Sequence, residues 1–569
     1  MEYTDILLTV SRGAMLLCSL CVLVRCLRSM LRERSDPETW AYLRTGGETM
    51  PITHWENLLG SSRRADLCLS LPGLRRFQAV RCRDDSGGWR LFDVFSRGGV
   101  AVNGTPVPRE GLPLRNGDSF SLAGNSLRFQ DADQARLEKL QAARSKAGDR
   151  VSPALTLAAL TVFQLFLLLQ HLLSAEAENV PAIVLGFFLL IILEWSCYNA
   201  MRVIGRSGFE VETLAFYLSS FGFSVVASSA PAEMYKQGLL LLLSLALFLL
   251  AGFWLRRLER TARMRLPAAL GALALLGLNL LFGRQINGAR NWLILGGISI
   301  QPSEFVKIAF VYVGAATLDK LYRRRNLFGF IAFSALCVGA LALMGDFGTA
   351  LIFFVSFLVI AFLRSGSVAT LFLSLAAAGM AGMLAFSIKP YIAARFLSWG
   401  NAWADRYGAG YQQTRAMSAA AAGGLLGKGA GVGWFHDVRL NAASNTDLVF
   451  GILCEELGLV LGLSAIAAMV ILALFVMRSV RNGRSAYFAI ASCAAVSMLL
   501  FQMGLNVFGS MDLLPFTGVP FPFVSKGGSS LLSCWMLLAF VKGADNRRDA
   551  SFAVRPGHLA VRRKKEART

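Results

Sequence analysis

Long apolar segments alternate with short polar ones along most of the chain. A membrane-spanning helix needs about 20 mainly apolar residues, and by this measure the sequence holds about thirteen candidate spans. They lie near residues 6–28, 153–173, 181–201, 210–230, 236–254, 266–283, 303–320, 328–344, 348–364, 369–387, 447–477, 486–508 and 523–543. With 55% hydrophobic residues, the chain is predicted to be a polytopic α-helical membrane protein.

Residues 40–135 break this pattern. They contain short runs in which apolar and polar residues alternate, such as WRLFDVF and SFSLAGNSLRF, separated by turn sequences such as VNGTP and RNGD. Strands of this length joined by Asn-Gly turns predict a small β-sandwich. A membrane anchor over 1–35 precedes it. A charged linker over 136–152 and two spans over 153–205 follow it.

Basic residues lie mainly beside the ends of the predicted spans. The chain has 57 Lys and Arg against 36 Asp and Glu, and its formal net charge is +21. Threading the spans places the clusters at Arg256–Arg265 and Arg562–Lys565 on the same side as the β-sandwich. The positive-inside rule makes that side the cytoplasm. We therefore expect an outside N-terminus, a basic cytoplasmic tail over 546–569, and no nucleic-acid ligand.

Cysteine and histidine do not form a metal-binding pattern. The ten cysteines are scattered and mostly lie within predicted spans, and none of the four histidines has a nearby His or Cys partner. Structural zinc needs four such ligands in register. We expect no structural metal site.

Two segments on the predicted outer side carry charged side chains. The sequence from 283 to 310, GRQINGARNWLILGGISIQPSEFVKIAF, contains Arg290 and Trp292 outside the membrane. It also places Glu304 and Lys307 three residues apart, on one face of the next helix. Opposite charges inside a bilayer helix are tolerable when paired, so the two residues fit either a packing ion pair or a substrate-lining pair.

A second outer segment of about 60 residues is too long to be an idle connection. Its GLLGKGAGVG run lacks the register of a phosphate-binding loop, which favours close backbone packing over nucleotide binding. The loop ends at Thr446 and Asp447, a typical capping position for the helix that follows. The last outer loop, LPFTGVPFPFVSKGGSS, has irregular backbone that is tolerated only in protein or beside a wet cavity.

These segments resemble the SEDS family (FtsW/RodA/SpoVE) in order and spacing. The matching motifs are NGARNW, QPSEFVK, GDFGTA, GYQQTRAM, NTDLVFGILCEELG and LPFTGVPFPFVSKGGSS. The resemblance covers residues 210–545 and implies a core of ten spans. It implies a peptidoglycan glycosyltransferase that polymerises lipid II on the outer face of the bacterial cytoplasmic membrane, with a class B penicillin-binding protein as partner. Alternatives are a lipid II flippase and a scaffold for cell division or sporulation.

The resemblance places the family's essential acidic residue at Asp447. A positioned carboxylate can act as the general base that deprotonates the acceptor sugar's 4-hydroxyl, in an inverting transfer. Basic side chains or a divalent cation such as Mg²⁺ or Mn²⁺ must offset the charge of the pyrophosphate leaving group. The expected substrate-binding residues are Arg395, Gln412, Arg290, Trp292, Glu304, Lys307, Lys428, Ser525 and Ser529.

The sequence departs from the family pattern at three positions near these residues. Asn291 separates Arg290 from the tryptophan that usually follows it directly. Lys526 stands where the family commonly has Tyr, and Asn445 where it usually has His. None of these changes removes the proposed base.

The β-sandwich region resembles a forkhead-associated (FHA) domain, a family that usually binds phosphothreonine. The expected phosphate-binding motifs are altered to Gly60-Ser61, Leu74-Arg75-Arg76-Phe77 and Ser96-Arg97-Gly98-Gly99. The candidate phosphopeptide-binding residues are Arg75, Arg76, Ser96 and Arg97, whose charges suit a phosphate. We expect a module that docks a cytoplasmic protein and binds phosphopeptides weakly or not at all.

Overall fold

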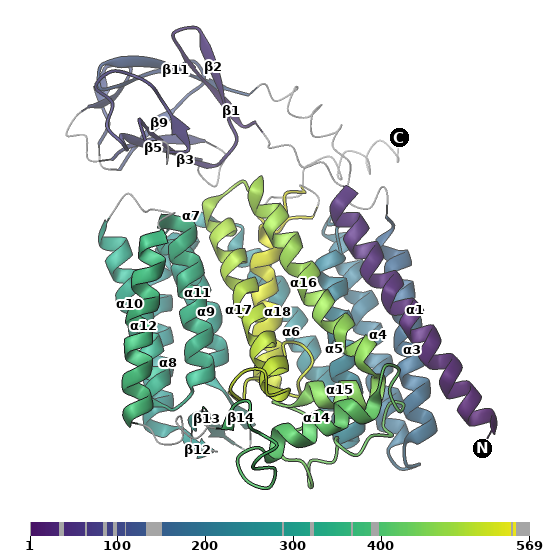
Figure 1. Ribbon diagram of the computed structural model, residues 1–569. Coiled ribbons are helices and arrows are strands. Elements are labelled where there is room, and N and C mark those ends of the chain that lie inside the picture. The colour runs from purple at the N-terminus through teal and green to yellow at the C-terminus, as the bar shows by residue number, and fades with distance from the viewer. Residues whose placement is uncertain are drawn as a thin grey trace, which may run out of the picture.

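The structure, a computed structural model, describes most of the chain. The described residues are 2–32, 39–62, 65–83, 88–94, 99–108, 110–132, 151–286, 289–296, 298–318, 324–365, 368–388, 396, 398–547 and 550–553. Most of the predicted linker, most of the predicted basic tail, and the site candidates Arg395, Ser96 and Arg97 therefore lie outside them. Helices run side by side as a bundle, with a β-sandwich at one end and a small sheet with two short helices at the other (Figure 1).

The helices of the bundle follow the predicted apolar segments closely. They are α1 (Glu2–Arg32), α3 (Pro153–Ser174), α4 (Val180–Val203), α5 (Glu210–Ser229), α6 (Met234–Leu255), α8 (Arg265–Phe282), α9 (Pro302–Leu318), α10 (Arg324–Leu343), α11 (Phe347–Ser365), α12 (Val368–Ile388), α16 (Leu459–Arg481), α17 (Ala486–Ser510) and α18 (Gly528–Gly543). In the described part of the chain, nine helices are long and apolar enough to cross a membrane. The polytopic helical class is confirmed, and the exact number of spans stays a prediction.

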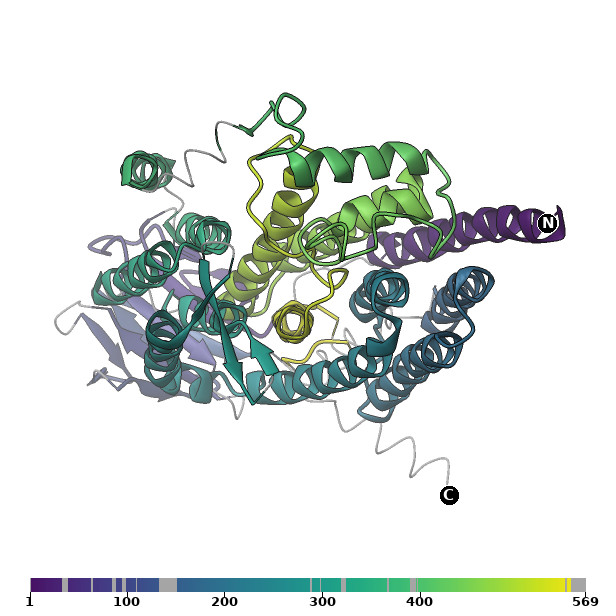
Figure 2. The same cartoon turned by 90° about the horizontal axis from the view of Figure 1, so that it is seen from below.

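Shorter helical elements also lie between the bundle helices, among them η1 (Pro231–Glu233), α7 (Leu258–Arg263) and α14 (Tyr411–Gly423). From below, α14 runs across the view whereas α18 is seen end-on (Figure 2). Helix α14 therefore lies across the end of the bundle and not along it. It packs against α15 (Val449–Leu457).

The predicted span over 447–477 is wrong as a single helix. The chain turns at Gly458, which has φ +90° and separates α15 from α16. A Cβ atom at this position would lie 2.4 Å from the carbonyl oxygen of Leu425. The break thus coincides with the close packing of a distant loop against the glycine, and the nine residues of α15 are all buried.

Helices α1 and α3 share the core of the bundle with the later helices. Both pack against α5, and α1 also contacts α16. Helix α5 is enclosed on nearly all sides, because 94% of the residues in its apolar segment are buried. Met15 and Phe163 belong to the same buried cluster as Trp535 of α18. The N-terminal helices are thus packed into the bundle.

The N-terminal region forms the expected sandwich of two sheets. Its strands are β1 (Ala41–Thr45), β2 (Glu48–Ile52), β3 (Glu56–Gly60), β4 (Leu67–Cys68), β5 (Ala79–Arg83), β6 (Trp89–Asp93), β7 (Val100–Val102), β8 (Thr105–Pro106), β9 (Leu112–Leu114), β10 (Ser119–Leu122) and β11 (Asn125–Asp131). One sheet has the order β2-β1-β11-β10-β7-β8 and the other β4-β3-β5-β6-β9. Leu43, Leu91 and Phe129 are fully buried in the core of the sandwich.

The sandwich touches the bundle through the start of β3. The backbone N–H of Trp55 donates to the carbonyl of Arg484 at 2.7 Å. The Glu56 carboxylate accepts from the Ser485 hydroxyl at 2.9 Å and the Ala486 N–H at 3.1 Å, at the N-terminus of α17. The sandwich and the N-terminus of α1 lie at opposite ends of the bundle (Figure 1). Which end faces the cytoplasm stays a prediction.

Candidate active site

Asp447 lies in a tight turn at the end of the bundle opposite the sandwich. Ala443 has φ +62°, and its carbonyl accepts from the N–H groups of Asp447 at 3.0 Å and Leu448 at 3.2 Å. The N-cap of α15 is Leu448, and no side chain caps the helix. The predicted capping role of Asp447 is therefore wrong. The turn delays the start of α15 by one residue and leaves the Asp447 side chain partly exposed.

A set of hydrogen bonds, here called the Asp447 clamp, ties this turn to the loop between α17 and α18, here called the α17–α18 loop. The Asn506 amide nitrogen donates to the carbonyls of Asp447 and Val519, both at 2.8 Å. The Ser525 hydroxyl donates to the Thr446 carbonyl at 2.5 Å. The Lys526 N–H donates to the Asn445 carbonyl at 2.9 Å. The structure thus brings the predicted residue Ser525 beside Asp447, and two of the departures from the family pattern meet.

The Asp447 carboxylate lies against a glycine of the α17–α18 loop. A Cβ atom on Gly518, which has φ +67°, would lie 3.3 Å from Asp447 Oδ2. The same loop packs closely against the start of α11. A Cβ atom placed on Gly348 would lie only 2.7 Å from Val519 Cγ1. Asp346 stands just before that helix and accepts from the Thr349 N–H at 3.1 Å. Burial raises the pKa of the Asp346 carboxyl.

Charged side chains that sequence reasoning missed lie at the other edge of the clamp. Lys526 Nζ is 3.1 Å from the Glu233 carboxylate, and Lys236 Nζ is 3.7 Å from the same group. The Asn445 amide donates to the Ser229 hydroxyl at 3.2 Å. Of these three charged residues, only Lys526 stands in a motif that the sequence analysis compared with the family, and there it was noted as a departure.

Glu304 and Lys307 form the ion pair expected from their spacing, with 2.8 Å between their charged atoms. Their side chains are 2% and 1% exposed. Lys307 also donates to Gln502 at 2.8 Å, and Gln502 donates to the Pro520 carbonyl at 2.8 Å. The enclosed pair fits the packing alternative, and it supports the α17–α18 loop from within the bundle.

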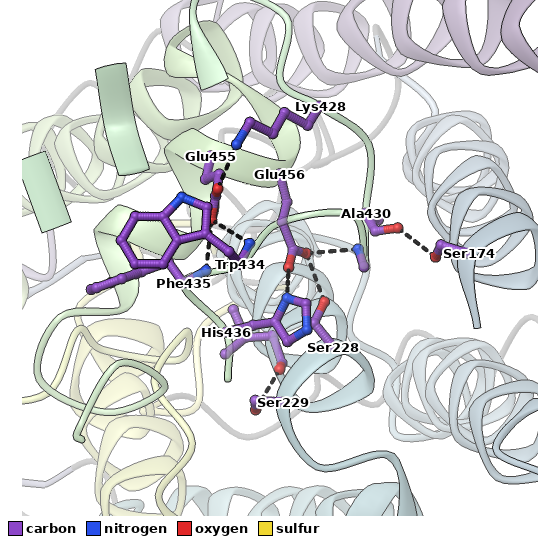
Figure 3. Close-up of polar contacts among 12 residues, drawn as sticks. Ser174, Ser228, Ser229, Lys428, Ala430, Trp434, Phe435, His436, Glu455 and Glu456 are labelled. Carbon is purple, nitrogen blue, oxygen red and sulfur yellow. Dashed lines mark hydrogen bonds and ion pairs between the residues drawn. The ribbon is translucent and has the colours of Figure 1, made fainter. Parts of the chain in front are cut away.

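The remaining loop candidates, Gln412 and Lys428, lie near α15. Gln412 lies in the first turn of α14 and donates to the Ala442 carbonyl at 3.5 Å, close to the Asp447 turn. Lys428 donates to Glu455 at 2.8 Å, so its charge is compensated. Figure 3 shows Glu455 and its neighbour Glu456 inside the loop from Lys428 to His436. Two adjacent carboxylates in an apolar helix were the available signal for this cluster, and sequence reasoning passed over it.

His436 contacts the second carboxylate of this pair, with Nδ1 2.9 Å from a Glu456 oxygen. Burial disfavours the charged imidazole, but the hydrogen bond and the negative charge of Glu456 outweigh it and raise the pKa of His436. The raised pKa favours the charged imidazole and, with it, an ion pair to Glu456.

Other predicted residues lie apart from this cluster. Arg290 and Trp292 belong to β13 (Ala289–Leu295), the middle strand of a small sheet with β12 (Arg284–Ile286) and β14 (Ile298–Ile300). The Arg290 N–H donates to the Met344 carbonyl at 2.8 Å, at the end of α10. Ser529 lies in the first turn of α18. Within the described residues, no group of three or more His, Cys, Asp or Glu side chains is arranged to hold a metal ion.

In the sandwich, the two predicted phosphate-binding loops that the structure describes lie side by side. The Ser61 N–H donates to the Arg75 carbonyl at 2.9 Å, and the Ser62 N–H to the Arg76 carbonyl at 3.3 Å. Arg75 and Arg76 are exposed. A Cβ atom on Gly60 would lie 2.1 Å from the Arg76 carbonyl oxygen, so glycine is required for this contact.

Known protein families match both the bundle and the sandwich of this chain. The family model of the FtsW/RodA/SpoVE cell cycle proteins matches residues 209–549, and the FHA domain model matches residues 57–123. A probable peptidoglycan glycosyltransferase FtsW of Tolumonas auensis is 31% identical over 357 residues, covering 59% of this chain and 91% of the relative. The peptidoglycan glycosyltransferase RodA of Mycobacterium tuberculosis is 30% identical over 328 residues, covering 54% and 69%.

A solved structure is also similar to the bundle. It comes from a study of how a peptidoglycan synthase complex coordinates polymerization and crosslinking. The similarity has a TM-score of 0.50 and 27% identity, and it covers 58% of this chain and 96% of the other. Helices α1, α3 and α4 precede the residues that the family model matches. The chain belongs to the FtsW/RodA/SpoVE family and carries an FHA domain ahead of the family core.

Proposed function

We propose that this protein is a peptidoglycan glycosyltransferase that polymerises lipid II on the outer face of the cytoplasmic membrane. The relatives named peptidoglycan glycosyltransferases support the activity, and the family model covers the residues of the Asp447 clamp. The observation that carries the proposal is the Asp447 side chain itself. It is partly exposed, and its turn is held by the amide of Asn506 and the hydroxyl of Ser525.

In this mechanism Asp447 is the general base. Its carboxylate takes the proton of the acceptor's 4-hydroxyl as that oxygen attacks the donor's anomeric carbon, and the lipid pyrophosphate leaves from the opposite face. The new linkage is therefore inverted relative to the donor. The clamp fixes the backbone of the base before substrate binds, which lowers the cost of reaching the reactive geometry.

The leaving group's charge must also be compensated. Arg290 is exposed at the same end of the bundle, whereas the charge of Lys428 is already paired with Glu455. We therefore assign this role to Arg290 and Arg395 ahead of Lys428. A divalent cation bound with the pyrophosphate would supply the same compensation. A class B penicillin-binding protein is the proposed partner that crosslinks the product.

Replacing Asp447 separates this proposal from its alternatives. Asp447→Asn keeps the side-chain volume and removes the base, and the exposed Asp405→Asn in the same outer region is the matched control. We expect Asp447→Asn to abolish glycan formation from lipid II and Asp405→Asn to preserve it. A flippase would instead move labelled lipid II across liposomes without forming glycan. A scaffold would complement a deletion strain even with Asp447 replaced.

We further propose that the FHA domain docks a cytoplasmic protein. The match to the FHA model and the adjacent exposed arginines support this role. The altered motifs favour weak phosphothreonine binding. Titrating the full-length protein with a phosphothreonine peptide and its unphosphorylated form tests this, with Arg75→Ala/Arg76→Ala as the control. Micromolar affinity that needs the phosphate would contradict the weak-binding proposal.

A further inference from the structure

The outer loop around the α15 carboxylates is held by two helices that lie outside the family core. The loop from Lys428 to His436 is here called the 428–436 loop. The Arg12 guanidinium of α1 donates to the Lys428 carbonyl. From α3, the Gln170 side-chain oxygen accepts from the Ala430 N–H at 3.0 Å, and the Ser174 hydroxyl donates to the Ala430 carbonyl at 2.7 Å. Both backbone groups of Ala430 are thus bonded by α3.

Helix α1 also fixes the orientation of Gln170. The Gln170 side-chain nitrogen donates to the Ser11 hydroxyl at 3.0 Å, and that hydroxyl donates to the Leu8 carbonyl at 2.8 Å. Gln170 and Ser11 are 0% and 1% exposed. The buried amide therefore uses its nitrogen toward α1 and its oxygen toward the loop, and a rotated amide would lose both bonds.

The loop backbone is shaped for this close approach. Gly431 has φ +75°, and a Cβ atom on it would lie 2.5 Å from Ser174 Oγ. On its other side the loop donates to α15: Gly431 N–H to Glu456 at 2.9 Å, and Phe435 N–H to Glu455 at 2.9 Å. Figure 3 shows these contacts from Ser174 through Ala430 to Glu456. The loop is therefore held between α3 and the two carboxylates.

Helix α15 connects this loop to the base. It has nine residues, all buried, and at 1.5 Å per residue it is about 13 Å long. Glu455 and Glu456 lie at its C-terminal end, and the Asp447 turn directly precedes its N-terminal end. Helix α5 contacts both ends, since Ser228 donates to Glu456 at 2.6 Å and Ser229 accepts from Asn445. A short buried helix with both ends held moves little on its own.

We propose that α1 and α3 form a brace that holds the 428–436 loop and, through α15, positions Asp447. Arg12, Gln170 and Ser174 are the positioning residues, and the inference rests on the proposed function of Asp447. The brace belongs to this chain's N-terminal helices, which the family model does not include. If α1 and α3 merely packed as membrane helices, their contacts with the loop backbone would not affect catalysis.

A disulfide tests whether the loop stays on the brace during turnover. The Ser174 Cβ lies 3.4 Å from an ideal Cβ on Gly431, close to the separation that a disulfide requires. We expect Ser174→Cys/Gly431→Cys to crosslink on mild oxidation, seen by mass spectrometry. The oxidised protein should polymerise lipid II as fast as its reduced form. Ser174→Cys and Gly431→Cys alone control for the native cysteines and for strain at the positive φ. Failure to crosslink, or activity lost on oxidation and restored by reduction, would overturn the proposal.

Rate measurements on the full-length protein with its partner test the link to catalysis. Gln170→Leu should lower kcat about tenfold with little change in KM, because the loop loses a buried hydrogen bond while the substrate contacts persist. Ser174→Ala should lower kcat and Ser174→Thr should restore it. Leu172→Ala, a partly exposed position on the same helix, is the matched control.

Wild-type kcat in Gln170→Leu, or an equal loss in Leu172→Ala, would contradict the brace. The crosslinking yield does not depend on activity. A crosslinked protein whose Asp447→Asn variant still polymerises would therefore overturn the proposed base and leave the loop contact in place.

Discussion

The Asp447 clamp depends most on Asn506, whose single amide nitrogen bonds two carbonyls at 2.8 Å each. Asn506 is 2% exposed, so water does not replace a lost donor. Asn506→Leu keeps the branched shape and the number of heavy atoms, and it removes both hydrogen bonds. Asn506→Asp places an acceptor against two carbonyl oxygens and should be the worse change.

The expected size of the effect follows from these contacts. Each buried carbonyl left without its partner costs about 1–3 kcal/mol. Among the described residues, the Asn506 amide oxygen is buried without a hydrogen-bond partner, so its removal in the leucine variant offsets one of the two losses. The net cost is about 1–3 kcal/mol. If the loss falls on the reactive geometry of Asp447, kcat drops about 5- to 150-fold.

The assay is the initial rate of lipid II polymerisation, together with hydrogen exchange of residues 443–448. Asn401→Leu, an exposed asparagine at the same end of the bundle, is the matched control. The rates should fall in the order wild type, leucine variant, aspartate variant, and exchange should rise in the same order. Wild-type rates in Asn506→Asp would refute the clamp as the support of the base.

Three further changes test separate parts of the site. Lys307→Met should destabilise the protein by about 3–5 kcal/mol, since it leaves Glu304 buried and unpaired, and adding Glu304→Gln should restore most of the melting temperature in detergent. Gly518→Ala should lower activity, because its Cβ would meet the Asp447 carboxylate, whereas Gly424→Ala, with φ +58° and nothing within 4 Å, should not. The raised pKa of His436 means that its ion pair contributes fully below about pH 6.5 and is lost as pH rises through the raised value. Hydrogen-exchange protection of its loop should fall accordingly, and His436→Gln should remove that pH dependence.

Features set by local sequence were predictable. The turn at Asn103 and Gly104, with φ of 48° and 83°, joins β7 to β8 as the Asn-Gly signal indicates. The Glu304–Lys307 pair follows from its spacing on one helix. The long apolar runs predicted the helices of the bundle because each run is apolar along nearly its whole length.

Features set by distant contacts were not predictable. Apolar residues continue across Gly458, yet the helix ends there, where the backbone of residues 425–427 approaches the glycine. Asp447 occupies a typical capping position, yet the turn at Ala443 moves the cap to Leu448. Nothing local to Gln170 indicates that it bonds a loop 260 residues further along the chain. Such partners are chosen by tertiary packing.

The Asp447 carboxylate is the proposed general base of the glycosyl transfer. The most direct measurement is glycan formation from labelled lipid II by Asp447→Asn and Asp405→Asn proteins, reconstituted in liposomes with the crosslinking partner. We expect no polymer from Asp447→Asn, normal polymer from Asp405→Asn, and equal folding and partner binding for both. Polymer of normal length and rate from a folded Asp447→Asn protein would contradict the account.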